Sequence, residues 1–123
     1  MKFNRLSMIM AAAMALAACS QTPAETSLKD AYADSFMIGC AVNPSHTSGR
    51  LEQANELLLT HFNAISPENC LKPEAVQPRP GVWTFEEADE YVRFGEEHDM
   101  WMLGHTLVWH NQTPSFYWEN PDG

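Results

Sequence analysis

The sequence predicts an α/β fold with a parallel sheet, and two observations carry this prediction. Three short apolar runs, at 36–42, 62–66 and 100–104, have the length of strands that are buried on both faces. The two longer stretches between these runs place apolar side chains at helical spacing. Strands that alternate with helices are joined by right-handed crossovers, which make the strands parallel. The 123 residues are enough for one domain at most.

The first predicted elements are a short helix at 28–33 and a strand at 36–42. Ser27 and Asp30 have the spacing of a helix cap. The strand is apolar without alternation, which is typical of burial on both faces. Residues 43–49 are rich in Pro, Ser, Thr and Gly, and they are predicted to be loop.

A second helix is predicted over 50–61, where apolar residues recur at three- and four-residue spacing. The second strand follows at 62–66 and is ended by Pro67. The prolines within 72–81 predict a loop or a single helical turn. These elements repeat the helix-then-strand order of the first part.

A third helix is predicted to begin at a capping box of Thr84 and Glu87 and to run to about His98. Its packing face is predicted to contain Phe85, Ala88, Tyr91, Val92 and Gly95. The aromatic residues assigned to the core are Phe85, Tyr91 and Trp101. The acidic residues assigned to the solvated face are Glu86, Glu87, Asp89 and Glu90. The strand at 100–104 completes a βαβαβ order.

Composition and charge exclude several classes of protein. Apolar residues make up 45% of the chain and charged residues 19%, which is typical of a globular protein. The net charge of −9 at pH 7 repels phosphate backbones and anionic lipid surfaces, so no nucleic-acid partner is predicted. The sequence contains no GxSxG, GxGxxG or P-loop motif, so a serine nucleophile and a nucleotide cofactor have no support.

The first 18 residues have the pattern of a signal peptide. A basic start is followed by an apolar run at 6–18, which is shorter than the roughly 20 residues that span a bilayer. The end of this run, Leu16-Ala17-Ala18-Cys19, resembles the lipobox of bacterial lipoproteins. This resemblance implies a lipidated Cys19 that anchors an exported protein to the bacterial cell envelope, with 19–27 as a flexible tether. The alternative is a plain signal peptide cleaved after Ala18, which would give a secreted protein.

Two further cysteines, Cys40 and Cys70, lie in the predicted domain. Cys40 falls within an apolar run, where a free thiol behaves as a small hydrophobic side chain. We therefore predict two buried thiols, although a disulfide between them stays open in an exported protein. The sequence contains no CxxC pair of the kind that binds zinc.

Polar and aromatic residues follow the second and third predicted strands. They are Glu68, Asn69 and Lys72 after the second strand, and His105, Trp109 and Gln112 after the third. The carboxyl ends of parallel strands meet at one edge of a sheet, where ligands bind. Carboxylate, amide, ammonium and imidazole groups can pair with several vicinal hydroxyls, and an indole can cover a sugar ring. The sequence therefore predicts a site for a neutral polyhydroxylated ligand.

Each of these residues also has a plainer structural interpretation, as a solvated loop side chain, a turn residue or a packed aromatic. A metal site is the alternative interpretation of His105 and His110, with Glu68 or Cys70 as a third ligand. The five-residue separation of the two histidines matches neither HxxxH nor HExxH geometry. No metal and no cofactor are therefore predicted.

Two segments carry a resemblance to a known family. Residues 62–72 are similar to the "FN-x-I-(T/S)-x-EN-x-x-K" segment of glycoside hydrolase family 10. Residues 104–112 are similar to the "GHTLVWH-x-Q" segment of the same family. Pro78, Phe85 and the pair Ala88-Asp89 fit the stretch between them. The resemblance extends over roughly 28–123.

The resemblance implies that the chain is the N-terminal part, about the first three βα units, of a (β/α)8 TIM barrel. The family consists chiefly of endo-1,4-β-xylanases that retain anomeric configuration, so the implied partner is xylan or a xylo-oligosaccharide. Its substrate-binding positions correspond here to Glu68, Asn69, Lys72, His105, Trp109 and Gln112. His110 occupies the motif's second histidine and is expected to support them.

The resemblance places both catalytic glutamates on later strands, beyond the matched part. We therefore expect no catalytic residue in this chain, and we expect the 123 residues to be inactive alone, as a truncated part of a longer enzyme. The alternative is a surface-anchored half-barrel that binds sugar without hydrolysis. No protein partner is predicted.

Overall fold

The computed structural model describes residues 25–119. The predicted signal peptide and Cys19 lie outside these residues. The elements, in chain order, are α2 (Leu28–Ala31), β1 (Gly39–Val42), α3 (Pro44–Thr47), α4 (Glu52–His61), β2 (Ala64–Pro67), α5 (Pro73–Val76), α6 (Glu86–Glu97), β3 (Trp101–Met102) and a 3-10 helix (Ser115–Tyr117). No helix in this part of the chain is both long and apolar enough to cross a membrane.

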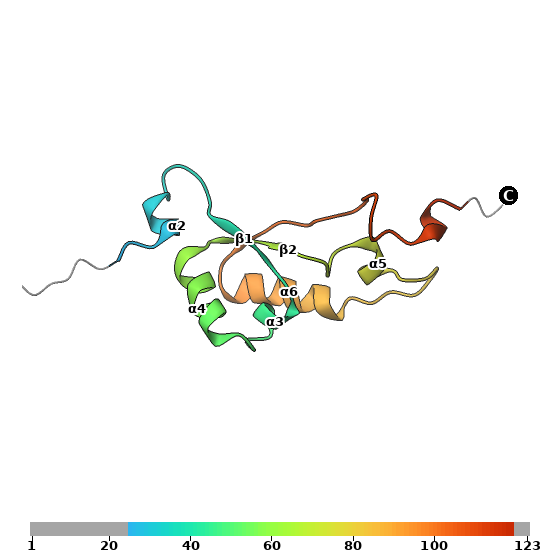
Figure 1. The fold of residues 1–123 in the computed structure, drawn as a ribbon, viewed down its shortest axis with the longest axis horizontal. Coiled ribbons are helices and arrows are strands. Elements are labelled where there is room, and N and C mark those ends of the chain that lie inside the picture. The colour runs from blue at the N-terminus through green and yellow to red at the C-terminus, as the bar shows by residue number, and fades with distance from the viewer. Residues whose placement is uncertain (1–24, 120–123) are drawn as a thin grey trace, which may run out of the picture.

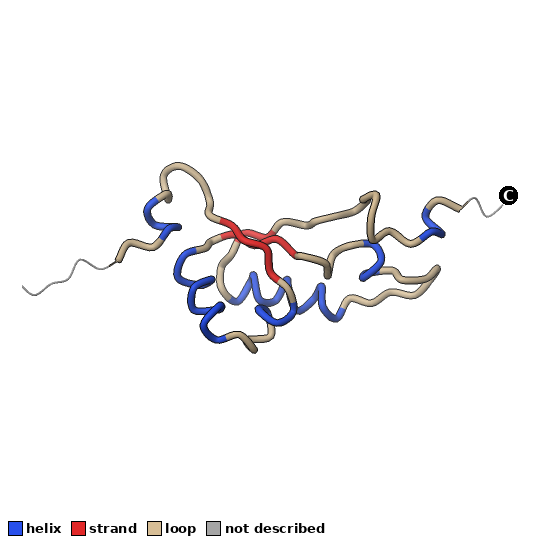
Figure 2. The backbone as a smooth tube through the Cα atoms, in the orientation of Figure 1, coloured by secondary structure: helices blue, strands red, loops and turns tan. Residues whose placement is uncertain are grey.

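The three strands form one parallel sheet in the order β1-β2-β3, as the alternation of strands and helices predicts. Val42 of β1 pairs with Pro67 of β2, and Ala64 of β2 pairs with Trp101 of β3. Helices α3, α4 and α6 lie on one side of the strands (Figure 1). The tube view shows the three strands side by side above these helices (Figure 2). The helices therefore cover one face of the sheet.

The prediction that 36–42 is buried on both faces is wrong. The strand begins only at Gly39, and the side chain of Phe36 is 57% exposed. Within β1, Cys40 and Val42 pack in or against the core, whereas Gly39 and Ala41 are exposed. Since strand side chains alternate between faces, covering one face buries only every second residue.

The prediction that 43–49 is loop is wrong in part, because α3 lies within it. Asn43 caps this helix by accepting a hydrogen bond from the Ser45 backbone N–H at 3.0 Å. Pro44 occupies the first helical position, where its fixed φ and missing N–H are tolerated. Pro44, which in the sequence is typical of a loop, is thus the first residue of a helix.

The predicted third helix is present as α6, but its start differs. Thr84 does not cap it, because the Thr84 hydroxyl donates to the backbone oxygen of Ala75. The residues of α6 that are buried are Ala88, Tyr91, Phe94 and Gly95. Phe94 thus takes the place in the packing face that was predicted for Val92, which is exposed.

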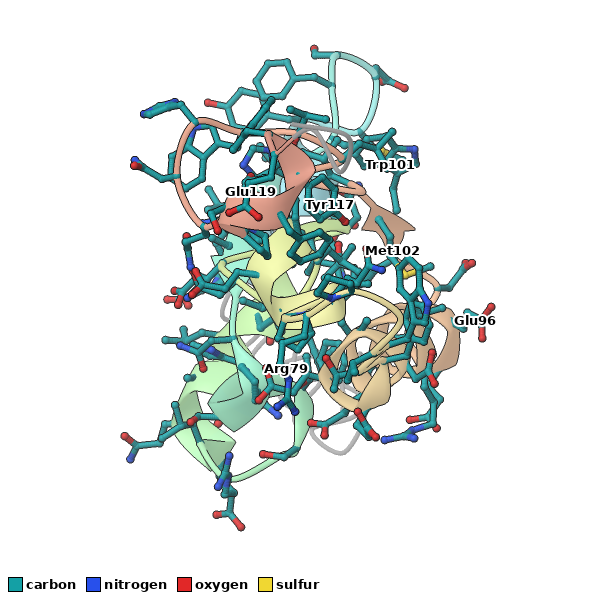
Figure 3. All side chains as sticks on the ribbon, turned by 90° about the vertical axis from the view of Figure 1, so that its right-hand side faces the viewer. Arg79, Glu96, Trp101, Met102, Tyr117 and Glu119 are labelled. Atoms are coloured by element: carbon teal, nitrogen blue, oxygen red, sulfur yellow. The ribbon has the colours of Figure 1, made fainter. Side chains whose placement is uncertain are left out.

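Of the three aromatic residues assigned to the core, only Tyr91 is buried, with 2% of its surface exposed. Phe85 is 47% exposed and stacks on the Trp83 ring, with centroids 5.7 Å apart. Trp101 is 52% exposed, whereas its neighbour Met102 packs against the core (Figure 3). The two side chains of β3 alternate, so Trp101 lies on the face that the helices leave open.

The core consists of residues from the sheet, α4, α6 and the adjoining loops: Val42, Leu58, Ile65, Cys70, Tyr91, Phe94 and Met100. The Tyr91 hydroxyl lies 2.8 Å from the backbone oxygen of Ile65 and 3.1 Å from that of Leu103, and donates to these carbonyls. These two contacts join α6 to β2 and to the residue that follows β3. Burial raises the pKa of the Tyr91 hydroxyl to about 12.

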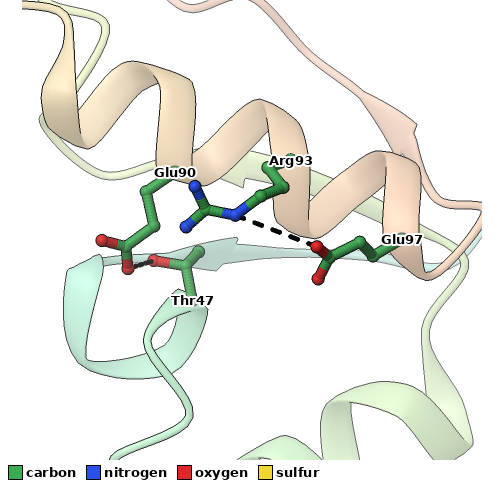
Figure 4. A network of polar contacts seen from close by, with 4 residues as sticks. All are labelled: Thr47, Glu90, Arg93 and Glu97. Atoms are coloured by element: carbon green, nitrogen blue, oxygen red, sulfur yellow. Dashed lines mark hydrogen bonds and ion pairs between the residues drawn. The ribbon is translucent and has the colours of Figure 1, made fainter.

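The acidic run of α6 lies on the solvated face, as predicted, except at Glu90. Glu90 is half-buried and accepts a hydrogen bond from the Thr47 hydroxyl at 2.8 Å, which joins α6 to α3 (Figure 4). One turn along, Arg93 pairs with Glu97 at 3.9 Å on the exposed surface. Glu96 points away from the molecule (Figure 3).

Cys40 and Cys70 are both free thiols, so they do not pair with each other. Cys70 is buried, as predicted, whereas Cys40 is only half-buried. Burial raises the pKa of each thiol. The nearby carboxylate of Glu87 raises the pKa of Cys70 further.

Candidate functional site

The predicted site residues come from the segments that follow β2 and β3. We call Glu68, Asn69, Lys72, His105, Trp109 and Gln112 the polar cluster. Glu68 follows β2 directly, and its backbone N–H donates to the Val42 oxygen at 2.9 Å, which extends the sheet ladder by one residue. The backbone N–H of Thr106 donates to the Leu71 oxygen at 3.3 Å. The first bond joins the end of β2 to β1, and the second holds the segments after β2 and β3 side by side.

Three side chains of the polar cluster form a closed triangle of hydrogen bonds. Lys72 Nζ donates to Asn69 Oδ1 at 3.2 Å and to Gln112 Oε1 at 2.7 Å. Gln112 Nε2 donates to the same Asn69 oxygen at 3.0 Å. Lys72 is only 7% exposed, and its two acceptors offset the cost of removing an ammonium group from water. The triangle therefore fixes the orientation of both amides.

The indole of Trp109 lies against this triangle. Lys72 Nζ is 4.5 Å from the centroid of the ring, within the range of a cation–π interaction. The ring of His105 lies 6.3 Å and the ring of His110 5.0 Å from Trp109, centroid to centroid. The Thr113 hydroxyl donates to the Trp109 backbone oxygen at 2.7 Å. Both histidine rings thus lie next to the indole that covers the triangle.

The loop that presents Gln112 is held by its own backbone. The residue has a φ of +50°, a left-handed conformation, and its carbonyl oxygen accepts a hydrogen bond from the Glu74 N–H at 2.9 Å. Since Glu74 lies in the first turn of α5, the helix that follows Lys72 also holds the loop that carries Gln112.

Glu68 lies on the exposed side of the polar cluster. Its Oε2 atom accepts a hydrogen bond from Asn43 Nδ2 at 3.2 Å. Sequence reasoning missed Asn43, which it placed in a loop. One signal could have identified Asn43. It comes directly after the first strand, just as Glu68 comes directly after the second.

The structure thus brings all six predicted residues to one edge of the sheet. Within residues 25–119, Asn69 Nδ2 and Glu68 Oε1 make no hydrogen bond, so one donor and one acceptor remain available to a ligand. Together with an indole face, these groups can bind a hydroxylated ring. No three metal-binding side chains converge within this part of the chain.

Known proteins share this sequence and this arrangement of elements. The sequence profile of glycosyl hydrolase family 10 matches residues 27–122. The endo-1,4-β-xylanase A of Halalkalibacterium halodurans is 43% identical over 97 residues, which cover 79% of this chain and 24% of that protein.

Solved structures superpose on the same region. Xylanase B from Clostridium stercorarium F9 has a TM-score of 0.72 at 41% identity, over 79% of this chain and 28% of that one. A mutant solved in complex with xylotriose has a TM-score of 0.71 at 37% identity, over 79% of this chain and 29% of that one. These superpositions confirm the predicted fold class, the first part of a (β/α)8 barrel. The chain spans about a quarter of the length of these relatives.

Proposed function

Since the chain belongs to glycosyl hydrolase family 10, we propose that the complete protein cleaves β-1,4-xylosidic bonds within xylan. Two comparisons support this proposal: the Halalkalibacterium relative is an endo-1,4-β-xylanase, and one superposed structure was solved with xylotriose. The observation that carries it in this chain is the hydrogen-bonded triangle of Lys72, Asn69 and Gln112 beneath the Trp109 indole.

In this proposal the polar cluster binds the xylose units. Glu68 accepts hydrogen bonds from sugar hydroxyls, and the unoccupied amide nitrogen of Asn69 donates to a hydroxyl oxygen. Lys72 has two of its three N–H groups engaged, so the third can reach a hydroxyl. Trp109 covers an apolar sugar face, with His105 and Gln112 beside it and His110 supporting the indole. A pentose chain carries no charge, which suits a cluster that combines one carboxylate with one ammonium.

Hydrolysis with retention requires two carboxyl groups about 5–5.5 Å apart. One protonates the leaving glycosidic oxygen, and the other attacks the anomeric carbon to form a covalent glycosyl-enzyme. Water, activated by the first group, then releases the sugar. We propose that both groups come from residues outside 1–123, because Glu68 is engaged with Asn43 and belongs to the sugar-binding motif. The 123 residues alone would then bind the substrate without cleaving it.

The direct test measures the release of reducing ends from xylan by the complete protein and by the 123-residue chain. We expect activity in the complete protein only, with an increase in internal chain cuts and β-configured first products by NMR. In the complete protein, Glu68→Gln and His105→Ala should each lower kcat/KM for xylo-oligosaccharides. Unchanged kcat/KM in both variants would contradict the assigned site. Binding of xylo-oligosaccharides by the complete protein, without release of reducing ends, would favour the non-catalytic sugar-binding alternative.

We also propose that the protein is exported and attached to the bacterial cell envelope through a lipidated Cys19. The support is the sequence pattern of 1–19, in which an apolar run ends at Leu16-Ala17-Ala18-Cys19. Two or more acyl chains give stable attachment, whereas one gives only marginal binding. Cells fed a labelled fatty acid should incorporate the label, and Cys19→Ala should abolish incorporation and release the protein from membranes. Label in the Cys19→Ala variant would contradict the assignment.

A further inference from the structure

We infer that Asn43 is a positioning residue whose side chain orients the Glu68 carboxylate toward a bound sugar. The inference rests on the proposed function, because it assigns a purpose to a contact of a proposed substrate-binding residue. Asn43 itself does not belong to the polar cluster. It stands directly after β1, whereas the members of that cluster follow β2 and β3.

The helix cap decides which way the Asn43 amide faces. Asn43 Oδ1 accepts the Ser45 backbone N–H at 3.0 Å, because the first turn of α3 leaves that donor without a helical partner. The backbone N–H of Asn43 also lies 3.3 Å from His46 Nδ1, which completes a capping box. With its oxygen committed to the helix, the amide can present only its nitrogen to the other side. A donor therefore faces Glu68.

The sheet register brings that donor to the carboxylate. Val42 pairs with Pro67 at the ends of β1 and β2, so the next residue of each strand, Asn43 and Glu68, stand opposite each other. Asn43 Nδ2 lies 3.2 Å from Glu68 Oε2, and the Glu68 N–H donates to the Val42 oxygen at 2.9 Å. Glu68 is thus held at both its backbone and one carboxylate oxygen. The other oxygen, Oε1, makes no hydrogen bond within residues 25–119 and remains available to a ligand.

A carboxylate on an exposed glutamate otherwise samples several rotamers, and ordering it costs conformational entropy when a ligand binds. The hydrogen bond from Asn43 orders the Glu68 carboxylate already in the free protein, so less conformational entropy is lost when a ligand binds. This pre-orientation of Glu68 is the role that the geometry points to for Asn43. A helix cap alone would need only the Asn43 oxygen.

Two substitutions separate the cap from the contact with Glu68. Asp and Ser cap helices about as well as Asn, so both Asn43→Asp and Asn43→Ser should keep the melting temperature of the complete protein. Asn43→Ser is too short to reach the carboxylate, and Asn43→Asp places a second negative charge beside it. We expect KM for xylo-oligosaccharides to rise about threefold in the Ser variant and about tenfold in the Asp variant, with kcat within about twofold.

Asn63→Asp is the matched control. Asn63 precedes β2, at the opposite end of the strand from Glu68, and its Oδ1 atom accepts the Ile38 N–H at 2.8 Å. The substitution keeps this acceptor and adds the same charge. We expect KM to remain unchanged in this variant.

A double-mutant cycle then tests whether Asn43 acts through Glu68. In the Glu68→Gln background, Asn43→Asp should have little further effect on KM. The inference is overturned if Asn43→Asp leaves KM unchanged, if its effect lies in kcat, or if the effect is equally large in the Glu68→Gln background. A Glu68→Gln variant with unaltered KM and kcat would instead overturn the assignment of Glu68 in the proposed function, which keeps the two failures distinct.

Discussion

The side chains of Lys72 and Gln112 meet at 2.7 Å although 40 residues separate them in the sequence. Lys72 follows β2 and Gln112 belongs to the loop after β3, so this bond joins the segments that follow two neighbouring strands. Asn69 accepts from both side chains, at 3.2 and 3.0 Å, and makes the connection three-way. The orientation of each amide in the cluster depends on the buried ammonium.

Lys72→Met tests that dependence in the complete protein. The substitution leaves Asn69 Oδ1 with one donor fewer and Gln112 Oε1 with none from the cluster, and it removes the charge from the Trp109 face. We expect kcat/KM for xylo-oligosaccharides to fall at least about tenfold and the free energy of unfolding to fall by about 1–3 kcal/mol. Steady-state kinetics and urea unfolding measure the two effects.

The chain offers a matched control in Lys29→Met. Lys29 lies on α2, and its Nζ donates to the Leu59 backbone oxygen at 2.6 Å, away from the polar cluster. Its loss should lower stability without altering kcat/KM. Equal kinetic losses in the two variants would show that the effect of Lys72 is only structural.

Tyr91 should make stability depend on pH in the alkaline range. Burial raises its pKa to about 12 in the folded chain, whereas an unfolded tyrosine ionises at about 10. The folded state therefore holds the proton more tightly, and the stabilisation is complete below pH 10 and is lost as the pH rises toward 12. Urea unfolding at several pH values between 9 and 12 measures this fall.

Tyr91→Phe isolates the contribution of the hydroxyl. The variant leaves the Ile65 and Leu103 carbonyls without this donor, so we expect its unfolding free energy to be lower by about 1–3 kcal/mol below pH 10. The gap between the two proteins should close as the pH approaches 12. A gap that stays constant across this range would refute the assignment of the pH dependence to Tyr91.

Gly95→Ala should destabilise the fold despite a better helix propensity. A Cβ at this position of α6 would lie 2.2 Å from the Met102 sulfur and 2.6 Å from its Cγ, so the side chain from β3 must move. Alanine is worth about 1 kcal/mol more than glycine inside an unhindered helix. We expect a lower melting temperature, because the displaced Met102 packs against the core.

The sign of this effect should reverse when Met102 is removed. In a Met102→Ala background the space beside Gly95 is open, so Gly95→Ala should raise the melting temperature relative to Met102→Ala alone. Thermal melting monitored by circular dichroism distinguishes the cases. Destabilisation of the same size in both backgrounds would mean that the close approach to Met102 is not the cause.

The two thiols predict a specific alkylation pattern in the folded protein. Cys40 and Cys70 do not pair, so prior reduction should not alter their labelling by iodoacetamide. Their raised pKa values lower the thiolate fraction near neutral pH, and both should react more slowly than a free cysteine. Cys70 is the more buried and should be the slower of the two. Mass spectrometry of the peptides measures this, and labelling that requires reduction would contradict it.

The sequence predicted the parts of the fold that depend on local apolar patterning. Apolar runs located all three strands, and helical spacing located α4 and α6. The errors fall where burial depends on what covers each face. Phe36 and Trp101 are as apolar as any core residue, but both remain exposed. Trp101 lies on the face of the sheet that the helices leave open, and Phe36 lies before β1, outside the sheet.

The candidate site was predictable because strand ends converge. Placing Glu68 and His105 after neighbouring parallel strands was enough to expect them at one edge. The hydrogen-bond partners were not predictable, since which atoms meet depends on rotamers and loop conformations. The left-handed φ of Gln112 and the contact between Asn43 and Glu68 are examples. No local sequence motif specifies the backbone conformation of Gln112 or the contact between Asn43 and Glu68.

The pairing of Val42 with Pro67 also limits how this chain can vary in length. One extra residue inside β1 or β2 would shift one strand past the other and turn the following side chains to the opposite face. Asn43 and Glu68 would then no longer stand level, even with every residue of the site still present. Insertions should be harmless in the exposed turns around 48–51 and 78–83, and damaging within 39–43 and 64–69. Loop-grafting or domain-insertion experiments on this chain would therefore do best to use those two turns.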